Sequence, residues 1–192
     1  MTAQRKLPEA PMTLDEFFVW DGGGHVGKLE LVDGVVRAMA PASATHSIIQ
    51  LNIAAAIKAH LRGGPCRVGT EAPIIPPMAR RINARAPDIA VTCAPVSDSP
   101  VFEDPVLIVE VLSPSNEAET WESIHALAGL VSLKEILIVQ STAVHADVYS
   151  RAADGAWPRD PVVVGGGGTI ILASMRCELS MAEVYAGTHL LG

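Results

Sequence analysis

The sequence is short of cysteine, and the three cysteines that it has form no metal or redox motif. Cys66, Cys93 and Cys177 are widely spaced, and no pair has the CxxC spacing. Zinc sites and thiol–disulfide catalysts usually need such a pair, so neither class is indicated. An odd number of isolated cysteines is typical of reduced core thiols in a cytoplasmic protein. The sequence therefore predicts three free thiols and a cytoplasmic location.

Long apolar runs are also missing. No stretch approaches the roughly 20 apolar residues that cross a bilayer, so a membrane protein is not predicted. The first eleven residues are polar and of mixed charge, and they lack the apolar segment of a secretion signal. We expect residues 1–11 to be a flexible tail. Residues 12–192 should form a single domain, because a chain of 192 residues suits one sizeable core.

The chain has no excess of positive charge. It carries 14 lysine and arginine residues against 21 aspartate and glutamate residues, which gives a formal net charge of −7. Proteins that bind nucleic acid over a wide surface usually show a basic face, so the composition counts against that class. Local clusters such as Arg80–Arg81 and Arg85 could still contact phosphates, and acids gathered at a metal site would add to the negative count.

Several catalytic motifs are missing as well. The histidines show neither HxxxH nor HxH spacing, so a zinc site is not indicated. Ser115 lacks the Gly-x-Ser-x-Gly setting of a hydrolase nucleophile. The four glycines at 165–168 are not followed by Lys-Ser/Thr, so we interpret them as a flexible turn and not as a phosphate loop.

What the sequence does contain is an alternation of short helical and extended segments. Apolar spacing and capping residues predict helices at 12–20, 43–61, 117–130 and 179–185. Strands are predicted at 28–32 and 35–39, around the turn Asp33-Gly34, and at 67–75, 86–93, 106–112, 135–140, 145–149 and 169–174. Asn116 and Glu119 are predicted to form a capping box. This order favours an α/β fold with a mixed sheet flanked by helices.

Glu110 is the one acidic residue in the apolar run 106–112, which is typical of a strand buried on both faces. A carboxylate there must be protonated, pair with a cation or bind a metal ion, because burial removes its hydration. Asp88 has a similar setting, and Pro87 keeps the backbone before it extended. Two acids at the ends of adjacent buried strands would form a metal site. The alternative is a structural pair held by Arg85 or by a backbone amide.

Three further residues are candidates for the same site. Lys28 and Glu30 would point to one face of a strand, which is either a solvated outer face or a face toward the site. His46 falls in the first turn of the 43–61 helix, directly after the hairpin. It is interpreted either as a surface or capping residue or as a neighbour of the site. The spacing alone leaves these alternatives open.

Together, these segments resemble a known family. Residues 29–34, His46, residues 87–91 and residues 109–115 are similar to motifs of the Uma-two-type putative restriction endonucleases. That family belongs to the PD-(D/E)XK nuclease-like superfamily. The resemblance covers roughly residues 12–186, nearly the whole chain. It implies a restriction-endonuclease-like fold, in which a mixed central sheet has helices on both sides.

The resemblance also implies a metal site. Asp88, Glu110 and Glu30 would bind Mg²⁺ or Mn²⁺, with the Val111 carbonyl as an additional ligand. Such an ion polarises a phosphate and lowers the pKa of an attacking water. His46 would orient water or phosphate.

The same resemblance implies DNA as the substrate. The duplex would lie across the cleft between the hairpin and the 43–61 helix, near Arg81 and Arg85. Nucleases of this fold often act as dimers so that both strands can be cut, and a homodimer is therefore expected from the resemblance.

The chain departs from the family at its lysine. The superfamily pattern puts a lysine two residues after the second acid, where this chain has Leu112. In the family the lysine more often stands on the following helix, where this chain has Ile124. Lys28 could replace it from the strand of Glu30.

The sequence thus predicts a Mg²⁺-dependent DNA endonuclease in which Lys28 serves as the lysine. The alternative is a catalytically impaired relative that acts as a metal- or nucleic-acid-binding or regulatory module. Loss of one positioned electrostatic group costs about 10²–10³-fold in rate. A slow nuclease and a relative that does not cleave would therefore have similar sequences.

Overall fold

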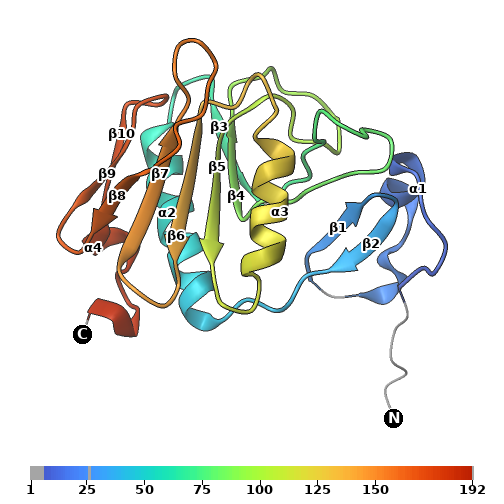
Figure 1. Ribbon diagram of the computed structural model, residues 1–192, viewed down its shortest axis with the longest axis horizontal. Helices are drawn as coiled ribbons and strands as arrows, with labels where there is room; N and C mark the ends of the chain where they lie inside the picture. Colours follow the sequence, from blue (N-terminus) through green and yellow to red (C-terminus); the bar gives the residue numbers. More distant parts are fainter. Residues whose placement is uncertain (1–6, 26, 192) are drawn as a thin grey trace.

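The structure is a computed structural model that describes residues 7–25 and 27–191. Its centre is a six-stranded mixed sheet in the order β3-β4-β5-β6-β7-β8. Helix α2 (Ala44–His60) covers one face of this sheet and helix α3 (Glu117–Leu127) covers the other (Figure 1). The predicted α/β architecture, a mixed sheet flanked by helices, is confirmed.

The sheet is mostly antiparallel, with one parallel pair at its centre. Its strands are β3 (Arg67–Thr70), β4 (Ile89–Thr92), β5 (Pro105–Leu112), β6 (Glu135–Gln140), β7 (His145–Ser150) and β8 (Val162–Gly165). Strands β5 and β6 are parallel, and all other neighbours are antiparallel. The parallel pair follows from α3, which carries the chain back along the sheet between these two strands.

The central strand β5 is buried on both faces, as its unbroken apolar run predicts. Val109 and Val111 pack in the core cluster under α2, whereas Ile108 and Leu112 pack in the cluster under α3. Because strand side chains alternate, Glu110 points to the α3 face of the sheet.

The N-terminal part forms a separate small layer beside the sheet. Helix α1 (Leu14–Val19) is followed by a 3₁₀ turn (Gly22–Gly24) and by the hairpin of β1 (Leu29–Val32) and β2 (Val35–Ala38). The hairpin turn is at Asp33-Gly34, as predicted. Leu7 packs against the apolar cluster of this layer, so this part of the predicted tail contacts the domain. Residues 1–6 lie outside the described residues.

The C-terminal part closes the core on the α2 face. Strands β9 (Thr169–Leu172) and β10 (Cys177–Ser180) form a hairpin, followed by α4 (Met181–Val184) and a 3₁₀ turn (His189–Leu191). The last predicted helix begins at Met181 and not at residue 179, because Leu179 and Ser180 pair with β9. Strands β8 and β10 were not predicted.

Three local predictions need correction. The strand predicted at 67–75 ends at Thr70, and Ile74 forms only an isolated bridge to Arg85. The strand predicted at 86–93 begins at Ile89. Asn116 forms no side-chain cap on α3, because its Oδ1 accepts hydrogen bonds from the backbone N–H and the hydroxyl of Ser113.

The prediction of three free thiols was wrong. Cys66 and Cys93 form a disulfide, and only Cys177 of the three is free. The sheet register explains the pair: Arg67 lies opposite Thr92, so the next residue outward on each strand is a cysteine. Sequence spacing alone could not show this proximity. In the described part of the chain, no helix is long and apolar enough to cross a membrane.

Candidate active site

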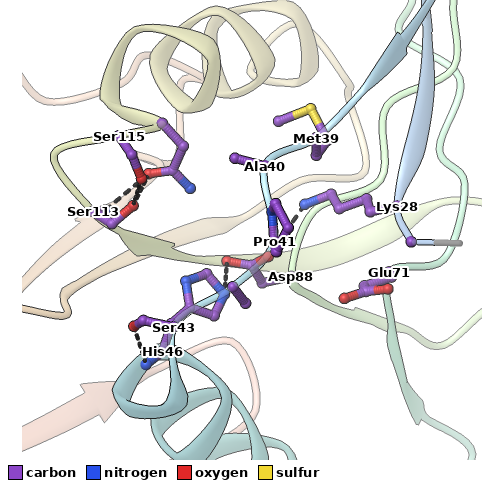
Figure 2. Close-up of a pocket in the computed structure, with 13 residues that line it drawn as sticks. Lys28, Met39, Ala40, Pro41, Ser43, His46, Glu71, Asp88, Ser113 and Ser115 are labelled. Atoms are coloured by element: carbon purple, nitrogen blue, oxygen red, sulfur yellow. Dashed lines mark hydrogen bonds and ion pairs between the residues drawn. The ribbon is translucent and has the colours of Figure 1, made fainter. Parts of the chain in front are cut away.

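A pocket of about 300 Å³ opens where α2 begins and where β4 and β5 meet. It brings together segments that lie far apart in the sequence, and Figure 2 shows Asp88 between Lys28 and His46 at its centre. The polar residues that line it are Lys28, Ser43, His46, Glu71, Asp88, Ser113, Ser115 and Asn116.

Asp88 is held from three sides. Its Oδ1 lies 3.2 Å from the Nζ of Lys28, and its Oδ2 lies 3.2 Å from the Nε2 of His46. The backbone N–H of Val111 donates to the same Oδ2 over 2.8 Å. The structure therefore brings Lys28 and His46 to the acid. Lys28 faces the site and not a solvated outer face, and His46 is a neighbour of the site and not a surface residue.

The sheet register positions the two acids. Ile89 pairs with Val109, so Asp88 stands opposite Glu110 at the point where β4 begins. The backbone N–H of Asp88 donates to Glu110 Oε2 over 3.3 Å. Both residues are buried. The predicted convergence of these two acids at the ends of adjacent strands is what the structure shows.

The surroundings keep Asp88 ionised. Burial alone would raise the pKa of its carboxyl, but the hydrogen bond from His46 and the charge of Lys28 outweigh burial. The charge of His46 and the Val111 amide act in the same direction, and the pKa of Asp88 falls to about 2. A carboxylate with these donors is a ready ligand for a cation.

Glu110 behaves in the opposite way. Burial raises the pKa of Glu110 well above its usual value, and the nearby charges of Asp88 and Glu30 add to this, against Lys28. The pKa of Lys28 is also raised: burial alone would lower it, but the charges of Glu110, Asp88 and Glu30 outweigh burial. An ionised aspartate and a lysine thus line the pocket, and Glu110, whose pKa is raised, is buried next to the aspartate and does not line the pocket itself.

Glu30 is engaged by a different set of partners. Its Oε1 accepts a hydrogen bond of 2.9 Å from the backbone N–H of Ala86, and its Oε2 lies 3.4 Å from Arg85 Nη1. Arg85 also contacts Glu122 over 3.0 Å, and Glu122 contacts Arg37 over 2.8 Å. These contacts lower the pKa of Glu122, first of all through the hydrogen bond from Arg85. A chain of charges therefore leads from Glu30 to the surface of α3.

This arrangement bears on the predicted DNA contacts. The side chain of Arg85 is only 5% exposed and is paired inside the protein, so it does not offer its charge to a surface ligand. The physical reason is the pair of carboxylates from Glu30 and Glu122, which hold the guanidinium in place. Arg81 is exposed, and its role in DNA contact stays a prediction.

The metal ligands also stay a prediction. Among residues 7–25 and 27–191, no group of three or more His, Cys, Asp and Glu side chains is arranged to hold a metal ion. Asp88 and Glu110 are adjacent, while the carboxylate of Glu30 is occupied by Arg85 and Ala86.

The Val111 carbonyl is placed suitably for a further ligand. Leu112 O accepts a hydrogen bond from Ser141 N on the β6 side. Since backbone groups of successive strand residues point to opposite edges, the N–H and C=O of Val111 point toward Asp88. The hydrogen bond from Val111 N to Asp88 agrees with this direction.

The sequence did not indicate two residues that donate hydrogen bonds to the backbone carbonyl of Asp88. Gln50 donates from its side chain to Asp88 O over 2.9 Å, and Glu71 donates from its backbone over 3.2 Å. Glu71 has a left-handed backbone, with φ of +52°, and it lines the pocket. Gln50 follows His46 by four residues, so helical periodicity could have placed the two on one side. Nothing in the sequence signalled Glu71.

The two positions at which the family resemblance implies a lysine belong to the core. Leu112 and Ile124 are both about 5% exposed or less and pack in the same apolar cluster between β5 and α3. A lysine at either position would have to bury its charge in that cluster. The cation of the pocket comes instead from Lys28, just before β1.

The chain is similar to other proteins in sequence and in fold. An uncharacterized protein of Synechocystis sp., slr1290, is 33% identical over 156 residues, which cover 78% of this chain and 81% of that protein. The crystal structure of a putative nuclease belonging to DUF820, from Anabaena variabilis, has a TM-score of 0.68 to this chain. It is 18% identical, and the match covers 92% of this chain and 98% of the other. This likeness confirms the predicted fold, a mixed central sheet flanked by helices.

The family itself is shown by a match over most of the sequence. Residues 14–182 fit the profile of the Uma2 family, which is described as putative restriction endonuclease. The matched segment includes both acids, Lys28 and His46, and the chain therefore belongs to the Uma2 family.

Proposed function

We propose that the protein is an endonuclease that uses Mg²⁺ or Mn²⁺ to hydrolyse phosphodiester bonds of DNA. The observation that carries this proposal is the contact of 3.2 Å between Lys28 Nζ and Asp88 Oδ1. It puts a half-buried lysine beside the acids, although the two lysine positions implied by the resemblance are apolar. The family membership supports the same activity.

The donor set fits a hard divalent ion. Mg²⁺ is commonly held by one or two carboxylates together with water and substrate phosphates, so Asp88, Glu110 and the Val111 carbonyl would be enough. Glu110 supports this fit, because a buried carboxyl with a raised pKa is stabilised as the anion when a cation replaces its proton. When bound, the ion would polarise the phosphate and lower the pKa of an attacking water.

Lys28 and His46 would supply the remaining electrostatics. The ammonium group of Lys28 is fixed by Asp88 and lines the pocket, so it could stabilise negative charge that develops on a bound phosphate. His46 holds Asp88 in place through its Nε2 and could orient a water molecule or a phosphate oxygen. Both groups are positioned before substrate binds, which favours catalysis by preorganised charge.

Nicking of supercoiled plasmid with Mg²⁺ or Mn²⁺ tests the role of Lys28. Lys28→Met should lower the nicking rate by about 10²–10³-fold, because one positioned charge is lost. Lys134→Met is the matched control, since Lys134 is exposed and lies outside this pocket. Equal rates for wild type and Lys28→Met would contradict the proposed role.

Asp88→Asn tests the metal site in the same assay, with Asp98→Asn, an exposed aspartate, as the control. Asp88→Asn should abolish both nicking and metal binding measured by calorimetry. Nicking that persists in Asp88→Asn would contradict the proposed mechanism. If the wild type binds metal through Asp88 but does not nick plasmid, the result would favour the alternative of a catalytically impaired metal-binding protein.

Dimerisation remains part of the proposal on functional grounds only. A nuclease with one site per chain needs two copies to cut both strands at once. Sedimentation of the protein with and without duplex DNA would measure the number of chains in the active species.

A further inference from the structure

A second pocket, of about 500 Å³, lies at the other end of α2. Its charged lining residues are Lys58, Arg62 and Arg67, and no acidic side chain lines it. The remaining lining residues are alanine, leucine, glycine, valine and cysteine. The chain has a net charge of −7, so this basic pocket is a local region of positive charge on an acidic protein.

The charge of Arg67 is fixed in place but not neutralised. Its guanidinium donates to the carbonyls of Ala94, over 2.5 Å, and of Pro95, over 3.1 Å. It also lies 5.6 Å from the centre of the Phe102 ring. All three partners are uncharged. Phe102 packs in the cluster under α3, whereas the neighbouring Val68 packs in the cluster under α2, so the guanidinium of Arg67 turns to the α3 face of the sheet, away from Lys58 and Arg62.

Lys58 and Arg62 are the two exposed cations of this pocket. They stand four residues apart, so they lie on one side of the end of α2. Within the described ranges, neither forms an ion pair with a carboxylate. The negative end of the helix dipole, worth about 0.3–1 kcal/mol, could explain Lys58, but it does not explain Arg62, which lies beyond the end of the helix.

The basic pocket is connected to the active site by two elements. Helix α2 begins at the active-site pocket with Ser43 and His46 and ends at Lys58. Twelve helical residues rise about 18 Å. Phosphates of one DNA strand follow each other by about 3.4 Å along the axis, so this rise corresponds to roughly five nucleotides. Strand β3 makes the same connection, from Arg67 to the residue before Glu71.

We propose, on the basis of the proposed nuclease function, that the basic pocket binds backbone phosphates of the DNA duplex away from the cleaved bond. Lys58 and Arg62 contact the phosphates. Such contacts position the duplex without reading its sequence. They also give an acidic protein a local surface that a polyanion can approach, and they replace the contact predicted at Arg85, which is internally paired.

Binding of a fluorescein-labelled duplex of 20 base pairs to the full chain in EDTA tests the proposal without cleavage. The double variant Lys58→Glu/Arg62→Glu should weaken binding by about tenfold or more, equally for unrelated sequences. The slope of log K against log salt should fall by about two, because two phosphate contacts are lost. The control is Lys134→Glu/Arg159→Glu, which changes the charge equally at exposed sites outside the pocket.

The outcomes separate this inference from the nuclease function. Equal weakening of DNA binding by both double variants, or no weakening by the pocket variant, contradicts the proposed role of the basic pocket, even when the wild type nicks plasmid. Weakened binding to heparin but not to DNA overturns it as well. Selective loss of DNA binding supports it even when no nicking is found. Arg62→Gln, a milder change, gives the same comparison if the double variant does not fold.

Discussion

Two glutamates stand in neighbouring buried strands, and their surroundings differ. Glu110 on β5 and Glu135 on β6 are 3% and 1% exposed. Glu135 accepts hydrogen bonds from Ser150 Oγ (3.0 Å), from the N–H groups of Ala173 and Ser174 (both 2.9 Å) and from Ser174 Oγ. Every donor is neutral and belongs to the protein. Glu135 therefore fastens the β9–β10 turn to the sheet.

Glu110 has fewer neutral donors and more charged neighbours. It accepts a hydrogen bond from the N–H of Asp88 and lies in the field of Lys28 and two other acids. It stands near the carboxyl end of β5, where ligands of α/β sheets commonly bind. The comparison teaches that an acid in a buried strand does not by itself mark a site. The charges around it and the pocket beside it make the difference.

The largest expected effect separates the two glutamates by activity. Glu110→Gln should lower plasmid nicking by about 10²–10³-fold, because a proposed metal ligand is lost. Glu135→Gln should leave the rate per folded molecule unchanged, because Glu135 contacts only structural donors. A comparable loss of nicking in both variants would remove the distinction.

Substitution of Glu135 should affect the free energy of unfolding, whereas substitution of Glu110 should mainly affect activity. Glu135→Ala removes the acceptor of the N–H groups of the exposed residues Ala173 and Ser174, and should lower the free energy of unfolding by about 1.5–3 kcal/mol, the usual value for hydrogen bonds to a charged group. Urea denaturation monitored by circular dichroism measures this. A change below the experimental error would mean that Glu135 is not the fastening group.

The pH dependence of stability sharpens the assignment of Glu110. Its pKa is raised in the folded state, so its contribution to stability is full below the unfolded pKa of about 4.5 and is lost as pH rises through the folded pKa. In EDTA, the wild type should lose stability with rising pH, and Glu110→Gln should lose less. Added Mg²⁺ or Mn²⁺ should restore more stability at high pH. Thermal melts from pH 5 to 9 provide the measurement, and parallel curves for the two proteins would count against the buried acid.

The smallest effect is expected at the outer end of the charge chain from Glu30. Arg37 and Glu122 are both 44% exposed, so their ion pair is screened by water. Arg37→Ala should change the free energy of unfolding by about 0.2–1 kcal/mol and leave nicking unchanged. A larger loss, measured by urea denaturation, would show that the exposed pair supports Arg85 and Glu30 more strongly than its exposure implies.

Much of the fold could be predicted, because its signals are local. The apolar run of β5, the Asp33-Gly34 turn and the apolar side of α2 each depend on neighbouring residues. Strands β8 and β10 could not be found in this way. Their short sequences pair with β7 and β9, and such pairing depends on residues far along the chain.

The sequence by itself determined that Asp88 and Glu110 need partners, because a buried carboxylate cannot remain charged alone. It also determined the order of elements that makes an α/β sheet. Only the tertiary structure decided which partners they have. The register of β4 and β5 sets the two acids opposite each other, and the hairpin brings Lys28 to Asp88 from 60 residues away. It likewise joined Cys66 to Cys93 and enclosed Arg85, since pairing across strands and burial of charge are settled only when distant segments pack together.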